Sequence, residues 1–163
     1  MRVLGIDPGS NCTGWGVLED GVKPAHVAHG CLRPPEDLPV AQRLLFLFRG
    51  LEGVIGQYAP QAAAVESVFV SHNAQSALKL GQARGALLAG LAASGLDVGE
   101  YTPLEVKKAV VGYGQAEKGQ VQEMMKMLLS LPKAAPADAS DALAVAWCHL
   151  HHLRWQSRGG RVA

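Results

Sequence analysis

Short apolar runs alternate with longer segments of helical periodicity along this chain, and the two patterns together predict a mixed α/β fold. Runs of strand length cover residues 2–6, 13–18, 25–32, 62–66 and 97–101. The first three precede any helical segment, which indicates an antiparallel meander, and the Asp20-Gly21 dipeptide between the second and third is a typical hairpin turn. A doubly wound fold would instead alternate strands and helices from the start.

Helical segments are predicted over residues 40–58, 73–94, 103–111, 120–131 and 138–153. Asn73 is a natural N-cap for the second segment, and Thr102 followed by Pro103 is a typical start for the third. Together with the strands, these helices predict a mixed five-stranded sheet with helices on both faces. The last helix is expected to be amphipathic. We expect a single domain over residues 1–153 and a mobile tail over residues 154–163.

The composition is that of a soluble globular protein large enough to bury a core, with 163 residues of which 48% are hydrophobic and 18% charged. No apolar run reaches the length of a membrane span, and the first predicted strand begins directly after Met1, so we expect neither a membrane segment nor a signal peptide. Cysteines occur only at positions 12, 31 and 148, without CxxC spacing. This pattern is typical of a reducing cytoplasm and predicts neither a disulfide framework nor a zinc site.

Net charge adds little by itself, at +1, but its distribution is uneven. Residues 1–66 contain 5 Lys or Arg against 7 Asp or Glu, whereas residues 67–163 contain 10 against 7. If the acidic residues discussed next form a cation site, the remaining surface is basic, which is compatible with binding to a polyanion.

Asp7 is the first candidate functional residue, because it ends an apolar run and Pro8-Gly9 then turns the chain. Strand ends at the edge of an α/β sheet are where ligands collect. The structural alternative is a local turn, since Asp-Pro-Gly is a favourable turn sequence. Glu66 ends the fourth apolar run in the same way, so both carboxylates would lie at one edge if these strands are adjacent and parallel.

Asp138 and Asp141 stand three residues apart at the start of the last helix and therefore share a face. Each also has a structural interpretation, as an N-cap or as a first-turn acid that the helix dipole favours. Docked beside the sheet edge, that face would complete a cluster of carboxylates that is costly to bury without a counter-ion. Oxygen ligands favour Mg²⁺ or Mn²⁺ over zinc, and two such ions about 3.5–4 Å apart catalyse phosphoryl transfer.

Four motifs resemble those of RuvC, the family of bacterial Holliday junction resolvases. They are Gly5-Ile6-Asp7-Pro8-Gly9, Val65-Glu66, the string over residues 73–85 and Ala137-Asp138-Ala139-Ser140-Asp141-Ala142-Leu143-Ala144. The match runs in order from residue 1 to about residue 153, and the string over residues 73–85 is its most specific part.

The resemblance implies an RNase H-like fold and a homodimer that makes paired, symmetric nicks in four-way junction DNA. It implies an Mg²⁺-dependent endodeoxyribonuclease with two ions per subunit, for which Mn²⁺ is a plausible substitute, and products with 5′-phosphate and 3′-hydroxyl ends. It also implies sequence preference at the cut and cooperation with the RuvA–RuvB branch-migration complex in homologous recombination and DNA repair. The residues that match the family's catalytic, metal-binding acids are Asp7, Glu66, Asp138 and Asp141.

The same resemblance assigns further residues to DNA or to the reaction, namely Phe69, Lys79, Arg84, Lys107 and Lys118. Phe69 is implied to stack on unpaired bases near the crossover. Lys107 and Lys118 match lysines beside the site, where each would pair with a phosphate or stabilise charge on the scissile group. Lys79 and Arg84 lie on the long helix and would meet backbone phosphates. The structural alternative for Phe69 is packing in the core, and for the lysines it is a solvated side chain.

The small residues Ala77, Gly81 and Gly85 fall on one stripe of the long helix, where another helix could approach closely. Two cuts related by a two-fold axis require two active sites so related, which a C2 homodimer supplies. We interpret the stripe as part of that dimer interface, and close packing within the chain is the alternative.

Two other classes of protein remain open. One is a junction-binding protein that keeps the fold without catalysis, although such a module gains nothing from placing acids near phosphate. The other is one lobe of a sugar-kinase or actin-like ATPase, because Asp7-Pro8-Gly9-Ser10 and Thr13-Gly14 resemble its phosphate loop. A chain of 163 residues leaves no room for the second lobe that closes on the nucleotide.

Overall fold

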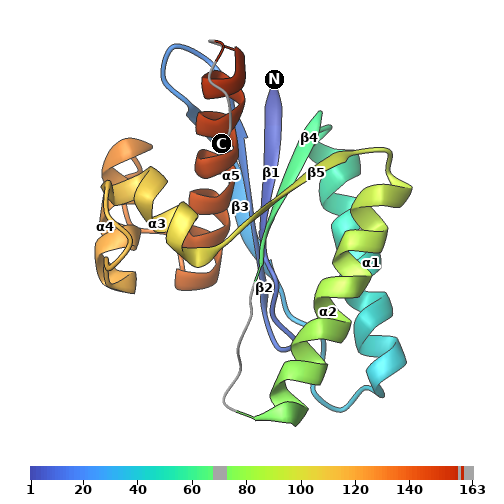
Figure 1. Ribbon diagram of the computed structural model, residues 1–163. Helices are drawn as coiled ribbons and strands as arrows, with labels where there is room; N and C mark the ends of the chain where they lie inside the picture. The colour runs from blue at the N-terminus through green and yellow to red at the C-terminus, as the bar shows by residue number, and fades with distance from the viewer. Residues whose placement is uncertain (68–72, 158, 160–163) are drawn as a thin grey trace.

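The computed structural model describes residues 1–67, 73–157 and 159, and its centre is a five-stranded sheet in the order β3-β2-β1-β4-β5 (Figure 1). The strands are β1 (Arg2–Asp7), β2 (Thr13–Glu19), β3 (Ala25–Leu32), β4 (Ala62–Glu66) and β5 (Asp97–Tyr101). The first three form the predicted antiparallel meander, whereas β4 is parallel to both β1 and β5. The mixed sheet expected from the sequence is therefore confirmed.

Helices cover both faces of this sheet. On one side lie α1 (Val40–Tyr58) and α2 (Ala74–Ala93), and on the other lie α3 (Pro103–Val111), α4 (Lys118–Leu128) and α5 (Ala137–Ser157) (Figure 1). Each layer has its own hydrophobic core, because side chains alternate between the two faces of every strand. Within the described residues, no helix is both long and apolar enough to cross a bilayer.

The predicted helix starts on either side of β5 are confirmed in detail. The Asn73 side chain accepts a hydrogen bond from the Ser76 backbone N–H at 2.8 Å. Thr102 and Glu105 form a reciprocal capping box at the start of α3. Helix α4 begins at Lys118, two residues before the predicted start at residue 120, because a second capping box joins Glu117 to Gln120.

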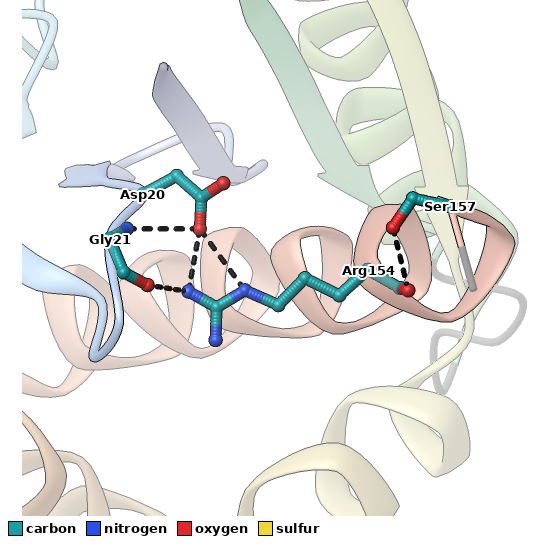
Figure 2. A network of polar contacts seen from close by, with 4 residues as sticks. All are labelled: Asp20, Gly21, Arg154 and Ser157. Atoms are coloured by element: carbon teal, nitrogen blue, oxygen red, sulfur yellow. Dashed lines mark hydrogen bonds and ion pairs between the residues drawn. The ribbon is translucent and has the colours of Figure 1, made fainter.

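Helix α5 extends to Ser157, four residues beyond the predicted end at Leu153. Figure 2 shows the interactions that hold this last turn: Arg154 donates hydrogen bonds to Asp20 Oδ1 at 2.6 and 3.1 Å and to the Gly21 carbonyl. The Ser157 hydroxyl donates to the Arg154 carbonyl at 2.9 Å. Arg154 is thus bound to the β2–β3 turn. The predicted helix end at Leu153 considered only apolar burial and missed this polar contact with a distant turn, whereas the mobility expected for residues 154–163 stays a prediction.

The expectation that α5 is amphipathic is wrong, because the helix is enclosed on all sides over residues 139–150. Every residue from 139 to 150 is buried except Asp141. Strands β1 and β2 pack against one side of the helix, and α3 and α4 pack against the other. A helix enclosed between a sheet and two helices has no solvent-facing stripe, so its sequence has no helical hydrophobic periodicity.

Glycines allow α5 to lie directly on the sheet. A Cβ atom at Gly5 would lie 2.0 Å from the Ala142 carbonyl oxygen, and one at Gly14 would lie 1.9 Å from the Asp138 carbonyl oxygen. Any side chain at these positions would push the helix away from β1 and β2. The contact at Gly14 fixes where α5 begins and therefore where its first carboxylate lies.

Candidate active site

One row of residues crosses the sheet at the carboxyl end of β1. Asp7 in β1 pairs with Gly14 in β2, and Gly14 pairs with Cys31 in β3. On the other side of β1, Ile6 is in register with Val65, so the next residues, Asp7 and Glu66, lie side by side at the ends of two parallel strands. The two strands that carry these carboxylates are therefore adjacent and parallel, as their predicted pairing required.

Helix α5 adds the other two acids. Asp138 lies over Gly14, beside Asp7, and Asp141 follows on the same helix face. All four carboxylates line one cavity of about 370 Å³ between the sheet edge, α3 and α5. The remaining lining residues are Pro8, Gly9, Cys12, Leu80, Pro103, Val106, Lys107, Lys118 and Val121. The structure thus brings together six of the residues selected from the sequence, the four acids and two of the lysines.

Burial and the repulsion of neighbouring acids keep Asp7, Glu66 and Asp141 from ionising freely. Burial, together with the charges of Glu66, Asp141 and Asp138, raises the pKa of Asp7 to about 8. Burial also raises the pKa of Glu66 and of Asp141. In its protonated form Asp7 donates a hydrogen bond to Glu66, which raises the pKa of Asp7 and opposes the rise for Glu66. Asp7 is therefore the acid on which the charges of the other three converge.

Two lysines partly offset this negative charge. Lys118 Nζ lies 3.7 Å from Asp141 Oδ2, and its side chain is 84% exposed. The charges of Lys118 and Lys107 oppose the rise in pKa of both Glu66 and Asp141. Because Lys118 is so exposed, its ammonium group stays solvated when it turns from Asp141 toward a bound anion.

The acid cavity fits hard divalent cations. Its donors are carboxylate oxygens, which are the ligands that Mg²⁺ and Mn²⁺ prefer. The raised pKa of Asp7 shows that these carboxylates lack sufficient positive charge nearby, and a divalent cation would supply it.

The other residues assigned to DNA lie elsewhere. Phe69 is outside the described residues. Lys79 is exposed on α2 and lines a separate cavity of about 420 Å³ together with Ser10 and Arg43. Arg84 forms an ion pair with Glu100 of β5. An Arg84 contact with phosphate would have to compete with this pair, and its role at DNA stays a prediction, as does that of Lys79.

The structure also places near the acids residues that were not selected from the sequence as site residues. Thr13 is fully buried, and its hydroxyl donates to the Gly9 carbonyl at 2.9 Å and accepts from the Gly9 N–H at 3.3 Å, which holds the turn after Asp7. Cys12 faces Asp138, and burial, with Asp138 and Cys31 nearby, raises the pKa of its thiol to about 12. A threonine four residues after a turn glycine is a usable sequence signal for the Thr13–Gly9 contact. No local pattern indicates that Cys12 faces Asp138.

Comparison with known proteins identifies the family. The model of the family described as "Crossover junction endodeoxyribonuclease RuvC" matches residues 3–149. The chain belongs to the RuvC family. A RuvC of Geobacter sulfurreducens, named crossover junction endodeoxyribonuclease, is 57% identical over 150 residues, which are 91% of this chain and 92% of that one. A RuvC of Geobacter metallireducens is 58% identical with the same coverage.

Solved RuvC structures confirm the RNase H-like fold. Thermus thermophilus RuvC in complex with Holliday junction substrate superposes with a TM-score of 0.90 and 32% identity, over 96% of this chain and 97% of that one. Yeast mitochondrial Ydc2, a Holliday junction resolvase, has a TM-score of 0.70 at 13% identity and shares the fold. Membership of the RuvC family removes the alternative of an ATPase lobe.

Proposed function

We propose that this chain is a structure-specific endodeoxyribonuclease that resolves Holliday junctions by paired symmetric nicks. The observation that carries the proposal is the acid cavity, where four carboxylates from β1, β4 and α5 meet beside two lysines in a chain of the RuvC family. The description of that family as crossover junction endodeoxyribonucleases and the junction complex of its T. thermophilus member support four-way junction DNA as the substrate.

Each carboxylate has a proposed place in the reaction. Asp7, whose pKa is raised by burial and by the charges of all three other acids, would be the ligand shared between two cations. Glu66 would hold one cation, and Asp138 and Asp141 would complete the cage. Two Mg²⁺ ions per subunit, with Mn²⁺ as a substitute, would supply the charge that activates water and stabilises the leaving oxygen.

The lysines complete the proposed chemistry. Water oxygen bonds to phosphorus while the bond from phosphorus to the 3′ oxygen breaks, and the 3′ oxygen takes up a proton. The products are 5′-phosphate and 3′-hydroxyl ends. Lys107 and Lys118 would neutralise charge that develops on the phosphate in this step. Phe69, Lys79 and Arg84 would contact DNA outside the acid cavity.

Two sites related by two-fold symmetry require a second copy of the chain, and α2 offers the surface for it. The predicted stripe faces away from the rest of the described chain: Ala77 is exposed, and a Cβ atom at Gly81 or Gly85 would meet nothing within 4 Å. Close packing within the described chain, the alternative for this stripe, is therefore wrong. Leu78 beside it is 62% exposed, which suits burial in a homodimer.

The wider setting is also part of the proposal. The chain would act in the cytoplasm on junctions delivered by RuvA–RuvB, as a nuclease domain over residues 1–153. Residues 154–157 continue α5, and Arg154 is bound to the β2–β3 turn, so we propose to extend this domain to Ser157 and to place the start of the tail after it.

The decisive experiment is cleavage of a labelled, immobile four-way junction in Mg²⁺, beside linear duplex of the same sequence. Wild type should nick two opposed strands of the junction and leave the duplex intact. Asp7→Asn should abolish cleavage, whereas Asp97→Asn, at an exposed position on β5, should not. Tight junction binding by wild type without nicking in Mg²⁺ or Mn²⁺ would replace the proposal with the binding-module alternative.

A further inference from the structure

A second group of side chains of types that can bind a metal lies at the β3 side of the acid cavity, whose wall includes Cys12 and Asp138. The thiols of Cys12 and Cys31 and the carboxylate of Asp138 have ligand atoms that all lie within 4.8 Å of one another. All three residues are half-buried. The proposed reaction uses Asp138 but neither cysteine. Cysteine spacing alone predicted no such site, because 18 residues separate the two thiols.

The sheet register explains why these side chains meet. Cys31 lies directly opposite Gly14, so it points to the same face of the sheet as the missing side chain of Gly14. That missing side chain makes room for the backbone of Asp138. Asp138 therefore lies over the middle of the row, with Asp7 on one side and Cys31 on the other.

Cys12 reaches the same place from the turn that precedes β2. The hydrogen bonds between Thr13 and Gly9 hold this turn in place. The Gly9 Cα also packs closely against the backbone of Cys12, where a Cβ atom would lie 2.1 Å from the Cys12 carbonyl oxygen. The Cys12 thiol is thus positioned by a turn with little freedom. Small side-chain rotations of Cys12, Cys31 and Asp138 would bring their ligand atoms around one ion.

The donor set differs in kind from the acid cavity. Two sulfurs and one oxygen suit borderline and soft cations such as Zn²⁺ and Cd²⁺, whereas Mg²⁺ requires oxygen donors. Two thiolates bound to tetrahedral zinc at about 2.3 Å lie about 3.8 Å apart, so the three groups would need to close by about 1 Å or less. Three protein ligands leave a fourth position for water.

We propose that Cys12, Cys31 and Asp138 form a site for a thiophilic divalent cation, and that filling it withdraws Asp138 from the acid cavity and inhibits cleavage. Both thiols lose their protons to solvent when the ion binds. The site itself does not depend on the proposed function, but the inhibition does. Occupation by Zn²⁺ would make the nuclease sensitive to thiophilic metal at fixed Mg²⁺.

The binding test uses CdCl₂ and the tag-free protein in a phosphine reductant, and it follows the ultraviolet charge-transfer absorbance of Cd–thiolate bonds. Wild type should bind one Cd²⁺ per chain with this absorbance. Cys31→Ser should reduce the absorbance per bound ion by about half, and Asp138→Asn should keep the absorbance but weaken binding at least about tenfold. The His26–His29 pair on β3 has no sulfur and cannot produce the signal.

Cys148→Ala is the matched control, because Cys148 is a buried free thiol on α5 outside the cluster. It should bind Cd²⁺ as wild type does. Absence of thiolate absorbance in wild type, or its persistence unchanged in Cys31→Ser, would overturn the site whatever the cleavage assay gives.

The inhibition is tested on the four-way junction at fixed Mg²⁺. Equimolar Zn²⁺ should inhibit wild type and Cys148→Ala at least about tenfold but leave Cys31→Ser active, since this variant keeps all four acids. Charge-transfer absorbance without inhibition would retain the site and overturn its effect on Asp138. Absence of cleavage in Mg²⁺ alone would instead count against the proposed function, and the absorbance would still decide the site.

Discussion

Replacing Asp7 by Asn should stabilise the metal-free protein, because the wild-type site holds a carboxylate that folding makes harder to ionise. Burial and three neighbouring acids raise the pKa of Asp7 from 3.8 to about 8. A carboxyl whose pKa is higher in the folded than in the unfolded state costs stability as pH rises from the unfolded to the folded pKa. Neutral Asn has the shape of protonated Asp and can still donate to Glu66, so it removes this cost.

The magnitude follows from the interval between pH 3.8 and pH 7. Over these roughly 3 pH units the unfolded state releases a proton that the folded state retains, at about 1.4 kcal/mol per unit. The cost at pH 7 is therefore on the order of 4 kcal/mol. For a chain of this length, 1 kcal/mol shifts Tm by about 2–4 °C, so Asp7→Asn should melt roughly 10 °C higher than wild type.

Thermal unfolding in excess EDTA measures this difference, with Asp97→Asn as an exposed control that should stay within about 0.5 kcal/mol of wild type. Wild type should lose stability between pH 4 and pH 8 more steeply than Asp7→Asn. Mg²⁺ should raise the Tm of wild type and should raise that of the variant much less, because a ligand that binds only the folded state stabilises it. An Asp7→Asn variant that melts at or below the wild-type temperature without metal would refute the argument that these acids repel one another in the folded state.

Three further substitutions test other parts of the structure. Gly14→Ala should lower the free energy of urea unfolding by about 1–3 kcal/mol and slow cleavage, because its Cβ atom would collide with the start of α5. Gly53→Ala should change neither quantity, because a Cβ atom there meets nothing within 4 Å. Lys118→Ala should slow single-turnover cleavage about a hundredfold, while the affinity for the junction changes less than tenfold. Lys133→Ala, at an exposed position, should leave the cleavage rate unchanged. An equal loss of rate in both variants would indicate a general charge effect. Gly85→Glu should give a monomer in light scattering, and a persistent dimer would remove α2 from the proposed interface.

Local sequence patterns predicted the elements well because the signals for strands and caps are local. Apolar runs, the Asn73 cap and the Thr102-Pro103 start all lie within a few residues of the structure that they specify. The position of Asp7 at a strand end follows from the same short pattern. The errors fall where a contact spans the chain: the ion pair between Arg154 and Asp20 extends α5, and its partners are 134 residues apart.

The sequence by itself determined the order of strands and helices, the two strand-end acids and the pair of acids on α5, and its motifs indicated the family. Only the tertiary structure decided that these acids share a cavity with two lysines, that the stripe on α2 faces outward, and that Cys12 and Cys31 meet at Asp138. Periodicity reports which face of an element is buried, but it carries no information about which distant element covers that face. In this protein the pairing of Asp7, Gly14 and Cys31 across three strands, and the absence of a side chain at Gly14, place α5 over the site.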